Sequence, residues 1–247
     1  MRLFTRFIRD APYTSHIPSV RIYVDFSFGP SADSPVFYSF STQIMGPLIT
    51  DERCRGIRFE LLLKVITAVF GKGNIIRFCN RPFEDVEMMN ETIISNWNNT
   101  VGLDDTVFHL GDFCLGGSAE WTKILDRLNG KIYLILGNHD LKNLRQGYVD
   151  RFEHVTMQMH IEVDKQKIYL NHYPFLCFDG GYKDVWQLFG HVHTRKNNTG
   201  IDAARLQYLY PTQYDVGVDN NNFMPVSFAQ MKIIIEKQVE QLKMKEQ

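Results

Sequence analysis

Two apolar runs, each followed at once by a polar turn that begins with glycine, constrain the fold of this chain more than any other feature. Val107–Leu110 leads into Gly111 and Asp112, and Ile132–Leu136 leads into Gly137–Asp140. Apolar runs of this length between turn residues are typical of buried strands, and the helical pattern between them predicts a β-α-β crossover. The two strands are then parallel, so both turns lie at the edge of the sheet where α/β folds bind their ligands.

Two turns that carry histidine follow the same plan. Lys167–Leu170 precedes Asn171 and His172, and Val185–Phe189 precedes Gly190–His193. Ordinary turn chemistry explains each turn taken alone, because Gly, Asp and Asn favour such positions. Four strand ends that together carry Asp, Asn and His match the oxygen and imidazole ligand set of Mn, Fe or Zn sites. The sequence therefore predicts a metal centre at this edge.

In their order, these motifs resemble those of the calcineurin-like metallophosphoesterases, whose pattern is D-x-H, G-D, G-N-H-[DE], a single His and G-H-x-H. The chain shows the last four as Gly111-Asp112, Gly137–Asp140, His172 and Gly190–His193. The resemblance covers about residues 65–247. It implies an α/β fold, a two-sheet β-sandwich flanked by helices in four αββα layers, with an N-terminal extension.

The first motif of the family is missing. When it is placed on Phe70-Gly71, its Asp falls at Thr67 and its His at Val69, and a further His of the most similar subgroup falls at Lys72. A gapped alternative would use Asp51, but no His accompanies that residue. Because a threonine hydroxyl is at most a weak ligand and a valine is none, one metal position is expected to be incomplete.

The resemblance implies a metal-binding role for each retained ligand. Asp112 would bridge two ions, Asn138, His172 and His191 would complete one position, and His193 would serve the other. The expected cofactor is a divalent transition metal (Mn, Fe, Zn or Ni), with one ion bound tightly. The second position would keep only Asp112 and His193.

Two residues of the third motif are the expected catalytic groups. His139 would protonate the leaving oxygen or stabilise the phosphoryl charge, and Asp140 would set its tautomer. Arg81, in the Asn80–Pro82 turn, is a candidate clamp for substrate phosphate. A solvated arginine at the entry to a helix explains Arg81 equally well.

The implied activity is hydrolysis of a phosphomonoester or phosphodiester by metal-activated water, impaired by the loss of the first motif. The substrate would be a phosphorylated small molecule or nucleotide. The alternatives are a catalytically inactive phosphate- or metal-binding regulatory domain on the same fold, and a structural module that binds no metal. The six retained Asp, Asn and His residues disfavour the last of these.

The composition divides the chain near residue 64. Residues 1–64 hold seven of the 14 arginines, five of the nine prolines and seven of the 18 phenylalanines, but only one lysine. They contain no motif that carries chemistry, so we expect an N-terminal extension of unknown role, followed by the phosphoesterase-like domain over 65–247.

Charge and cysteine usage exclude several functional classes. The formal net charge of −1 gives no broad electrostatic surface for nucleic acid or membrane. The four cysteines show neither C-x-x-C spacing nor a dense disulfide pattern, which favours a reducing, cytoplasmic setting. Met1–Asp10 is interrupted by arginines and does not read as a signal peptide, and no uncharged run reaches the length of a membrane span.

Three helices are predicted from periodicity and capping residues. The first spans Pro82–Trp97, and the second starts at Ser118 and closes at Gly130. The third opens at a capping box formed by Ser227 and Gln230. Their apolar faces are expected to cover the core.

Overall fold

The computed structural model of the chain describes residues 63–71, 73–144, 151–193 and 203–245. All of them belong to one compact unit, Met45–Gln247. The expected boundary between residues 64 and 65 falls inside the first strand, β1 (Leu63–Ile66). The expectations for residues 1–62, Asp51 among them, and for Lys72 lie outside the described residues.

The first sheet has five strands in the order β4-β3-β2-β1-β9. Strands β1 to β4 pair in parallel, and β9 pairs with β1 in the antiparallel sense. The other strands of this sheet are β2 (Thr106–His109), β3 (Lys131–Ile135), β4 (His154–Thr156) and β9 (Val226–Ser227). Since β2 and β3 are parallel with helix α4 (Ser118–Leu125) between them in the chain, the predicted β-α-β crossover is confirmed.

The second sheet has four strands in the order β5-β6-β7-β8. They are β5 (Gln158–Val163), β6 (Gln166–Asn171), β7 (Trp186–Phe189) and β8 (Gln213–Asp215). Strands β5 and β6 form a hairpin whose turn residues, Asp164 and Lys165, both have positive φ, as a type I′ turn requires. Strands β6, β7 and β8 are parallel, so this sheet also brings several strand ends to one edge.

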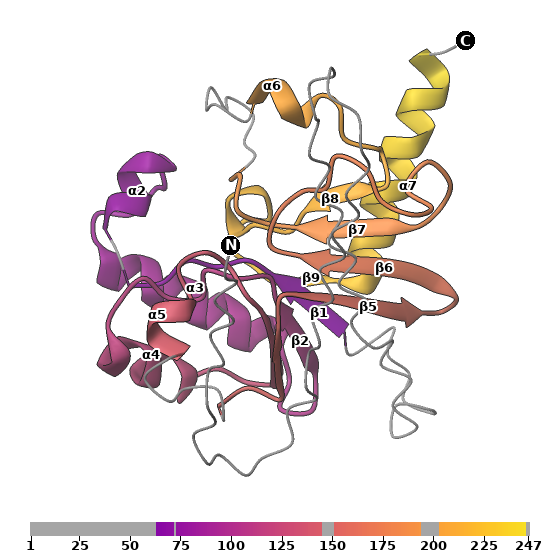
Figure 1. Cartoon of the computed structure of the whole chain (residues 1–247). Coiled ribbons are helices and arrows are strands. Elements are labelled where there is room, and N and C mark those ends of the chain that lie inside the picture. The colour runs from indigo at the N-terminus through magenta and orange to yellow at the C-terminus, as the bar shows by residue number, and fades with distance from the viewer. Residues whose placement is uncertain (1–62, 72, 145–150, 194–202, 246–247) are drawn as a thin grey trace, which may run out of the picture. The chain divides into compact units, whose positions relative to one another are not determined.

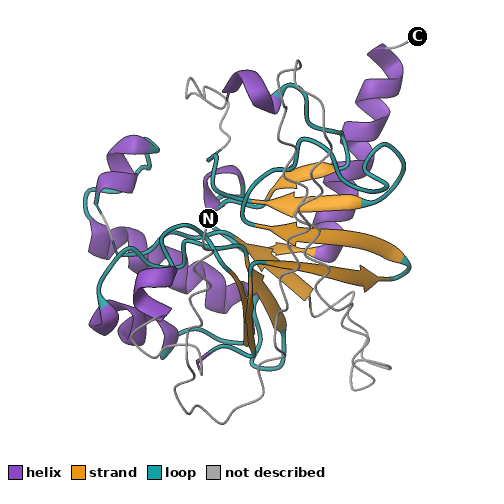
Figure 2. Ribbon diagram, in the orientation of Figure 1, coloured by secondary structure: helices purple, strands orange, loops and turns teal. Residues whose placement is uncertain are grey.

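Helices α2 (Asn74–Phe78), α3 (Val86–Thr100), α4 and α5 (Leu141–Asn143) gather on one side of the first sheet, and the second sheet lies on the other (Figure 1, Figure 2). Helices α6 (Ala203–Leu206) and α7 (Phe228–Lys245) lie on the side of the second sheet, and a 3₁₀ turn, η4 (Val218–Asn220), follows β8. The last helix, α7, contacts β9, β1 and β8. Among the described residues, the structure has no helix with both the length and the apolar character that crossing a membrane requires.

Alternation along the strands of the first sheet produces two separate cores. In β3, Ile132 and Leu134 belong to the cluster that the helices cover, which also contains Trp97 and Trp121. The alternating residues Tyr133 and Ile135 face a second cluster, between the two sheets. Burying one such aliphatic side chain contributes about 1.5–3 kcal/mol.

The cluster between the sheets draws its members from both of them. Val65 and Leu110 come from the first sheet or its strand ends, and Leu170 and Leu188 come from the second. Two facing sheets with helices confirm the predicted α/β sandwich.

The predicted helix starts are partly wrong. Helix α3 begins at Val86 rather than at Pro82, because the Asp85 side chain caps it by accepting a 2.7 Å hydrogen bond from the Met88 amide. In the second helix, Gly117 takes the N-cap position, and the helix ends at Leu125, before Gly130.

The third predicted helix start is right. Ser227 N donates to Gln230 Oε1 at 2.9 Å, and Gln230 N donates to Ser227 Oγ at 3.3 Å, so the capping box at the start of α7 is confirmed.

Candidate metal centre

Four strand ends place their polar side chains around one nitrogen atom, Nε2 of His172. This atom lies 3.1 Å from His191 Nδ1, 3.2 Å from Asn138 Oδ1 and 3.4 Å from Asp112 Oδ2. Asp112 and Asn138 follow β2 and β3 of the first sheet, and the two histidines follow β6 and β7 of the second. The structure therefore brings together the four residues that the sequence proposes for one metal position.

The hydrogen bond of His172 shows that the cluster consists of acceptor atoms, which suits a cation. Its Nδ1 donates a 2.7 Å hydrogen bond to the carbonyl oxygen of Leu110, so in the neutral ring the lone pair is on Nε2. The carboxylate of Asp112 and the amide oxygen of Asn138 are also acceptors. Ligands about 2.1 Å from one ion lie about 3.0 Å apart in octahedral geometry and about 3.4 Å apart in tetrahedral geometry. The observed separations fall in this interval, so the residues fit a divalent metal ion.

Burial makes this cluster of acceptors costly without a cation. The side chain of His172 is 1% exposed and that of Asp112 is 9% exposed. Burial opposes ionisation of Asp112, yet the contacts of this carboxyl with His172 and the His139 amide hold its pKa below its usual value. Asp112 is therefore the negative charge of the cluster, and a cation between the ligands compensates for it.

Glycines let the ligand-bearing loops touch. A Cβ on Gly111, whose φ is +85°, would lie 2.5 Å from both the Gly137 amide nitrogen and His172 Nδ1. A Cβ on Gly137 would lie 2.3 Å from Asp112 Oδ1. No side chain fits at these distances, which explains why both motifs begin with glycine.

Three non-glycine residues of the site adopt left-handed backbone conformations. The φ angles of Asp112, His191 and His193 are 54°, 67° and 45°. Such conformations cost free energy and persist only where the surroundings enforce them, and they cluster at functional sites.

Asp140 holds two ligand loops together, which is a role that the sequence did not predict. Its Oδ2 accepts hydrogen bonds from the amides of Gly137 and Asp112 at 2.7 and 2.8 Å, and its Oδ1 accepts one from Phe113 at 2.8 Å. Burial raises the pKa of this carboxyl, and the three amide bonds partly offset that effect. Both carboxylate oxygens are thus engaged with the backbone of the loops.

His139 lies beside the cluster and is exposed. Its amide donates a 2.9 Å hydrogen bond to Asp112 Oδ1, which fixes the backbone at this position. The ring is thus attached to the metal centre through its main chain and is accessible to a bound molecule.

Tyr173 belongs to the site, although it was not among the predicted residues. Its hydroxyl donates to Asn138 Oδ1 at 3.3 Å, and its ring packs edge-on against those of His172 and His191, with centroids 4.8 and 4.7 Å away. Tyr173 follows His172 directly in the chain, and this position next to a predicted ligand is the sequence feature that could have identified it.

The position of the missing first motif lies next to this cluster. Thr67 Oγ1 donates to the Leu110 carbonyl at 3.4 Å. A Cβ on Gly190 would lie 2.3 Å from Thr67 Oγ1. Thr67 therefore stands between the β2 and β7 strand ends, where the family has its Asp. Val69 is 3% exposed and belongs to the apolar cluster under the helices, so it supplies no ligand.

His193 makes a different contact from the one the resemblance implies. Its Nδ1 lies 2.9 Å from Asp219 Oδ2, in the η4 turn that follows β8. Burial opposes protonation, but the carboxylate of Asp219 and the Cys79 thiol raise the pKa of His193 to about 9. The pKa of Asp219 is correspondingly low, despite burial, because His193 and Arg81 bind its charged form.

Arg81 is buried in an ion pair, which corrects its expected role as a phosphate clamp. Its Nε and Nη2 donate to the two carboxylate oxygens of Asp219 at 2.8 and 2.9 Å, and its Nη1 donates to the Val69 carbonyl at 3.4 Å. The side chain is 1% exposed. A guanidinium that is engaged in this way does not reach a phosphate in solution.

A family model that matches more than half of the sequence decides the family of this chain. A model of the calcineurin-like phosphoesterases matches residues 72–222, which span the four motifs described above. The chain belongs to the calcineurin-like phosphoesterase family. Membership implies a metal-dependent phosphoesterase domain, and the acceptor cluster around His172 supplies a ligand group for a divalent metal within it.

Two relatives of this calcineurin-like chain have names that state no activity. An uncharacterized protein, MJ1445 of Methanocaldococcus jannaschii, is 35% identical over 170 residues, which is 68% of this chain and 87% of that protein. The Gene 66 protein of Mycobacterium phage L5 is 28% identical over 158 residues, which is 49% of this chain and 76% of that protein.

A solved structure supports the fold alone. The crystal structure of AQ665 from Aquifex aeolicus, a protein of unknown function, matches with a TM-score of 0.51 at 23% identity. The match covers 73% of this chain and 98% of that one.

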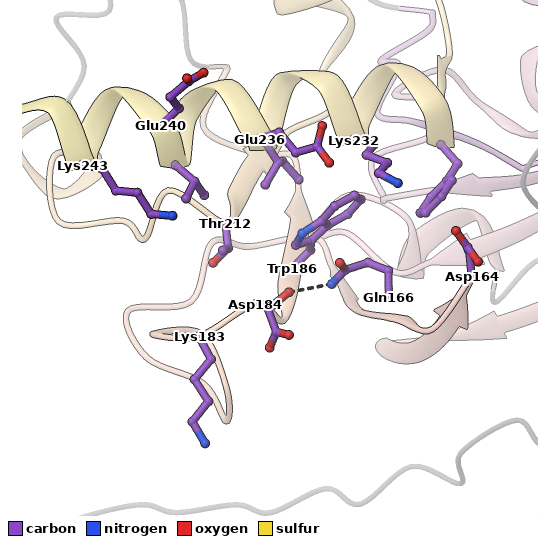
Figure 3. Close-up of a pocket in the computed structure, with 13 residues that line it drawn as sticks. Asp164, Gln166, Lys183, Asp184, Trp186, Thr212, Lys232, Glu236, Glu240 and Lys243 are labelled. Atoms are coloured by element: carbon purple, nitrogen blue, oxygen red, sulfur yellow. Dashed lines mark hydrogen bonds between the residues drawn. The ribbon is translucent and has the colours of Figure 1, made fainter.

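A cavity of about 730 Å³ lies apart from the metal centre, beside α7 (Figure 3). Its lining includes Trp186, three lysines and four carboxylates, and none of the residues of the calcineurin-like motifs. With acids and bases mixed, the cavity has no charge that would select a phosphate.

Proposed function

We propose that this chain hydrolyses a phosphomonoester or phosphodiester with one divalent metal ion held by Asp112, Asn138, His172 and His191. The observation that carries the proposal is the set of acceptor atoms 3.1–3.4 Å from the buried His172 Nε2, an arrangement that a bound cation would stabilise. Family membership supports phosphoesters as the substrate class.

The bound ion would supply Lewis acidity and lower the pKa of an attacking water. A mixed ligand set of one carboxylate, one amide oxygen and two imidazoles suits Mn, Fe, Zn or Ni. The Leu110 carbonyl holds His172 in the tautomer that a metal requires, and Tyr173 fixes the amide oxygen of Asn138.

His139 is the proposed general acid. Its exposed ring follows Asn138 in the chain, and its amide is bonded to Asp112, so a phosphate at the metal centre would lie beside it. The ring would hold a proton for the leaving oxygen. Asp140 acts through the backbone, because it keeps the β2 and β3 loops in contact.

The substrate is proposed to be a phosphorylated small molecule or nucleotide in a reducing cytoplasm. The three cysteines that the structure describes, Cys79, Cys114 and Cys177, are not in disulfides, which supports this setting.

A catalytically inactive phosphate- or metal-binding regulatory domain is the second candidate function. The observation that favours it is the replacement of the first motif by Thr67 and Val69, together with the burial of Arg81. These changes remove two metal ligands and one candidate phosphate clamp.

Metal content and turnover, measured together, test the proposal. The reconstituted protein is expected to hold one tightly bound ion per chain and to hydrolyse an aryl phosphate or a bis-aryl phosphate slowly. His172→Ala should lose both properties, whereas His160→Ala, in β5 of the same domain, should keep them. Tight metal binding without turnover would favour the inactive domain. No metal after reconstitution would overturn the hydrolase and leave only the phosphate-binding form of the second candidate.

A further inference from the structure

Three side chains with metal-ligand atoms meet beside the first centre. Cys79 follows helix α2, His193 lies in the turn after β7, and Asp219 lies in η4. The sulfur, an imidazole nitrogen and a carboxylate oxygen of these residues all lie within 4.8 Å of one another. The three segments are distant in sequence, so the fold itself creates this cluster.

From this cluster we infer a second metal site, in which Cys79, His193 and Asp219 bind Zn²⁺. A thiolate, an imidazole and a carboxylate are all ligands that Zn²⁺ accepts, and three protein ligands with one open position are typical of catalytic zinc sites. The site replaces the ligands that are missing at Thr67 and Val69 with others from outside the family pattern.

The distances suit a metal with little rearrangement. His193 Nδ1 and Asp219 Oδ2 are 2.9 Å apart, close to the separation of about 3.0–3.4 Å between two ligands of one ion. The Cys79 thiol is buried and not in a disulfide. The three ligand atoms lie within 4.8 Å of one another, so closing a tetrahedral site would bring the outermost pair closer by about 1.2 Å at most.

Arg81 supports the carboxylate from behind. Its bidentate hydrogen bonds, 2.8 and 2.9 Å long, fix the plane of the Asp219 carboxylate, in the way that outer partners orient metal ligands. With the thiolate and the carboxylate balanced by Zn²⁺, the arginine leaves the site with net positive charge. An anionic oxygen is therefore the favoured occupant of the open position.

The two sites share one short turn. His191 points to the first centre and His193 to the second, and only Val192 separates them in the chain. A phosphate bound at one site would thus lie near the other. Metal binding at the second site stands on its own geometry, whereas its part in hydrolysis rests on the proposed function.

Titration of the full-length, metal-free chain with Co²⁺ tests this inference, since thiolate-bound Co²⁺ shows a near-ultraviolet charge-transfer absorption that imidazole and carboxylate sites lack. The wild type should bind two ions and show this absorption with the second, weaker one. Cys79→Ser should lose the absorption and about one ion per chain. Cys177→Ser, at an exposed cysteine, should lose neither.

A second readout covers the case in which Cys79→Ser folds poorly. In the wild type, Zn²⁺ should slow alkylation of Cys79 by iodoacetamide at least tenfold, measured by peptide mass spectrometry in mild denaturant, with Cys177 as the internal reference. His172→Ala should abolish the first ion but leave the Co²⁺ absorption, which separates this inference from the proposed function. A single ion per chain, absorption that survives Cys79→Ser, or no protection by Zn²⁺ would each overturn it and leave a hydrogen-bonded triad.

Discussion

The two neighbouring candidate metal positions of this domain differ in how their side chains are paired. The first holds four residues of the family motifs, and their atoms face one another at metal-ligand distances. At the second, Thr67 and Val69 stand where the resemblance would place Asp and His, and His193 pairs with Asp219, which in turn pairs with Arg81. Most buried polar groups have a hydrogen-bond partner, and at the second position residues outside the motifs supply it.

The largest expected effect concerns the ion pair of the second position. Asp219→Ala should lower the free energy of unfolding by about 3–5 kcal/mol, because it leaves the buried Arg81 charge without a partner. Arg127→Ala, which breaks the exposed pair with Glu91, should cost less than about 1 kcal/mol. Denaturant unfolding of the metal-free proteins measures both. Equal effects would mean that the network at the second position contributes no more than a surface pair.

The frame of the first centre can be weakened separately. Asp140→Asn should destabilise the protein by about 2–3 kcal/mol, because an amide nitrogen would face backbone N–H donors that now bind a carboxylate. The same substitution at the exposed turn residue Asp164 should change stability by less than about 0.5 kcal/mol. Isothermal calorimetry should also show weaker metal binding in Asp140→Asn alone. Unchanged metal affinity would show that the β2 and β3 loops do not need this clamp.

Restoring the missing motif sharpens the comparison further. Thr67→Asp with Val69→His should raise turnover of a generic diester at least about tenfold, or about 1.4 kcal/mol of barrier, since Thr67 already stands between the two strand ends. Adding His139→Asn should remove most of the gain. A native enzyme already as fast as the double variant would show that the second position is functional as it stands.

A further effect concerns pH. The pKa of His193 is raised to about 9, so its protonation stabilises the metal-free folded state below the unfolded value of about 6.5, and this contribution is lost as pH rises through 9. The stability difference between wild type and His193→Asn should therefore shrink by up to about 3 kcal/mol between pH 6 and pH 10, since each pKa unit corresponds to about 1.4 kcal/mol. A difference that grows with pH would contradict the pairing with Asp219.

The smallest effect is expected from the N-terminal segment. A chain that starts at Arg58 should keep the metal affinity of the first centre within about twofold, because every described ligand lies beyond it. Loss of solubility alone would be compatible with this prediction, since the removed segment is rich in phenylalanine. A folded but metal-free product would place a ligand such as Asp51 or His16 in the segment.

The first centre was predictable because its ligands obey a local rule. Parallel strands end together, so Asp112, Asn138, His172 and His191 could be grouped from four short apolar runs and the turns that follow them. Asp219 also follows a strand, β8, but it lies outside the four motifs, and nothing in its turn marks it as a partner of His193. The sequence therefore grouped one set of candidate ligands and missed the partner of His193.

Arg81 shows why the other contacts of the candidate site could not be predicted from the sequence. Its neighbours in the chain suggest an exposed turn, but the carboxylate that holds it lies 138 residues away. A contact over this separation leaves no periodicity or spacing in the sequence, and only the folded chain reveals it. The same holds for Asp140, whose environment of three backbone amides depends on how closely two glycines let the loops approach.

The way the first centre draws on both sheets bears on the order of folding. The loops of Asp112 and Asn138 are tied by hydrogen bonds that span at most 28 residues, so the β2-α4-β3 segment can shape half of the centre early and at a low cost in chain entropy. His172 meets the Leu110 carbonyl across 62 residues, and His191 comes later still in the chain. A half-folded chain therefore offers an ion only two of its four ligands. Tight metal uptake marks the moment at which the two sheets have docked.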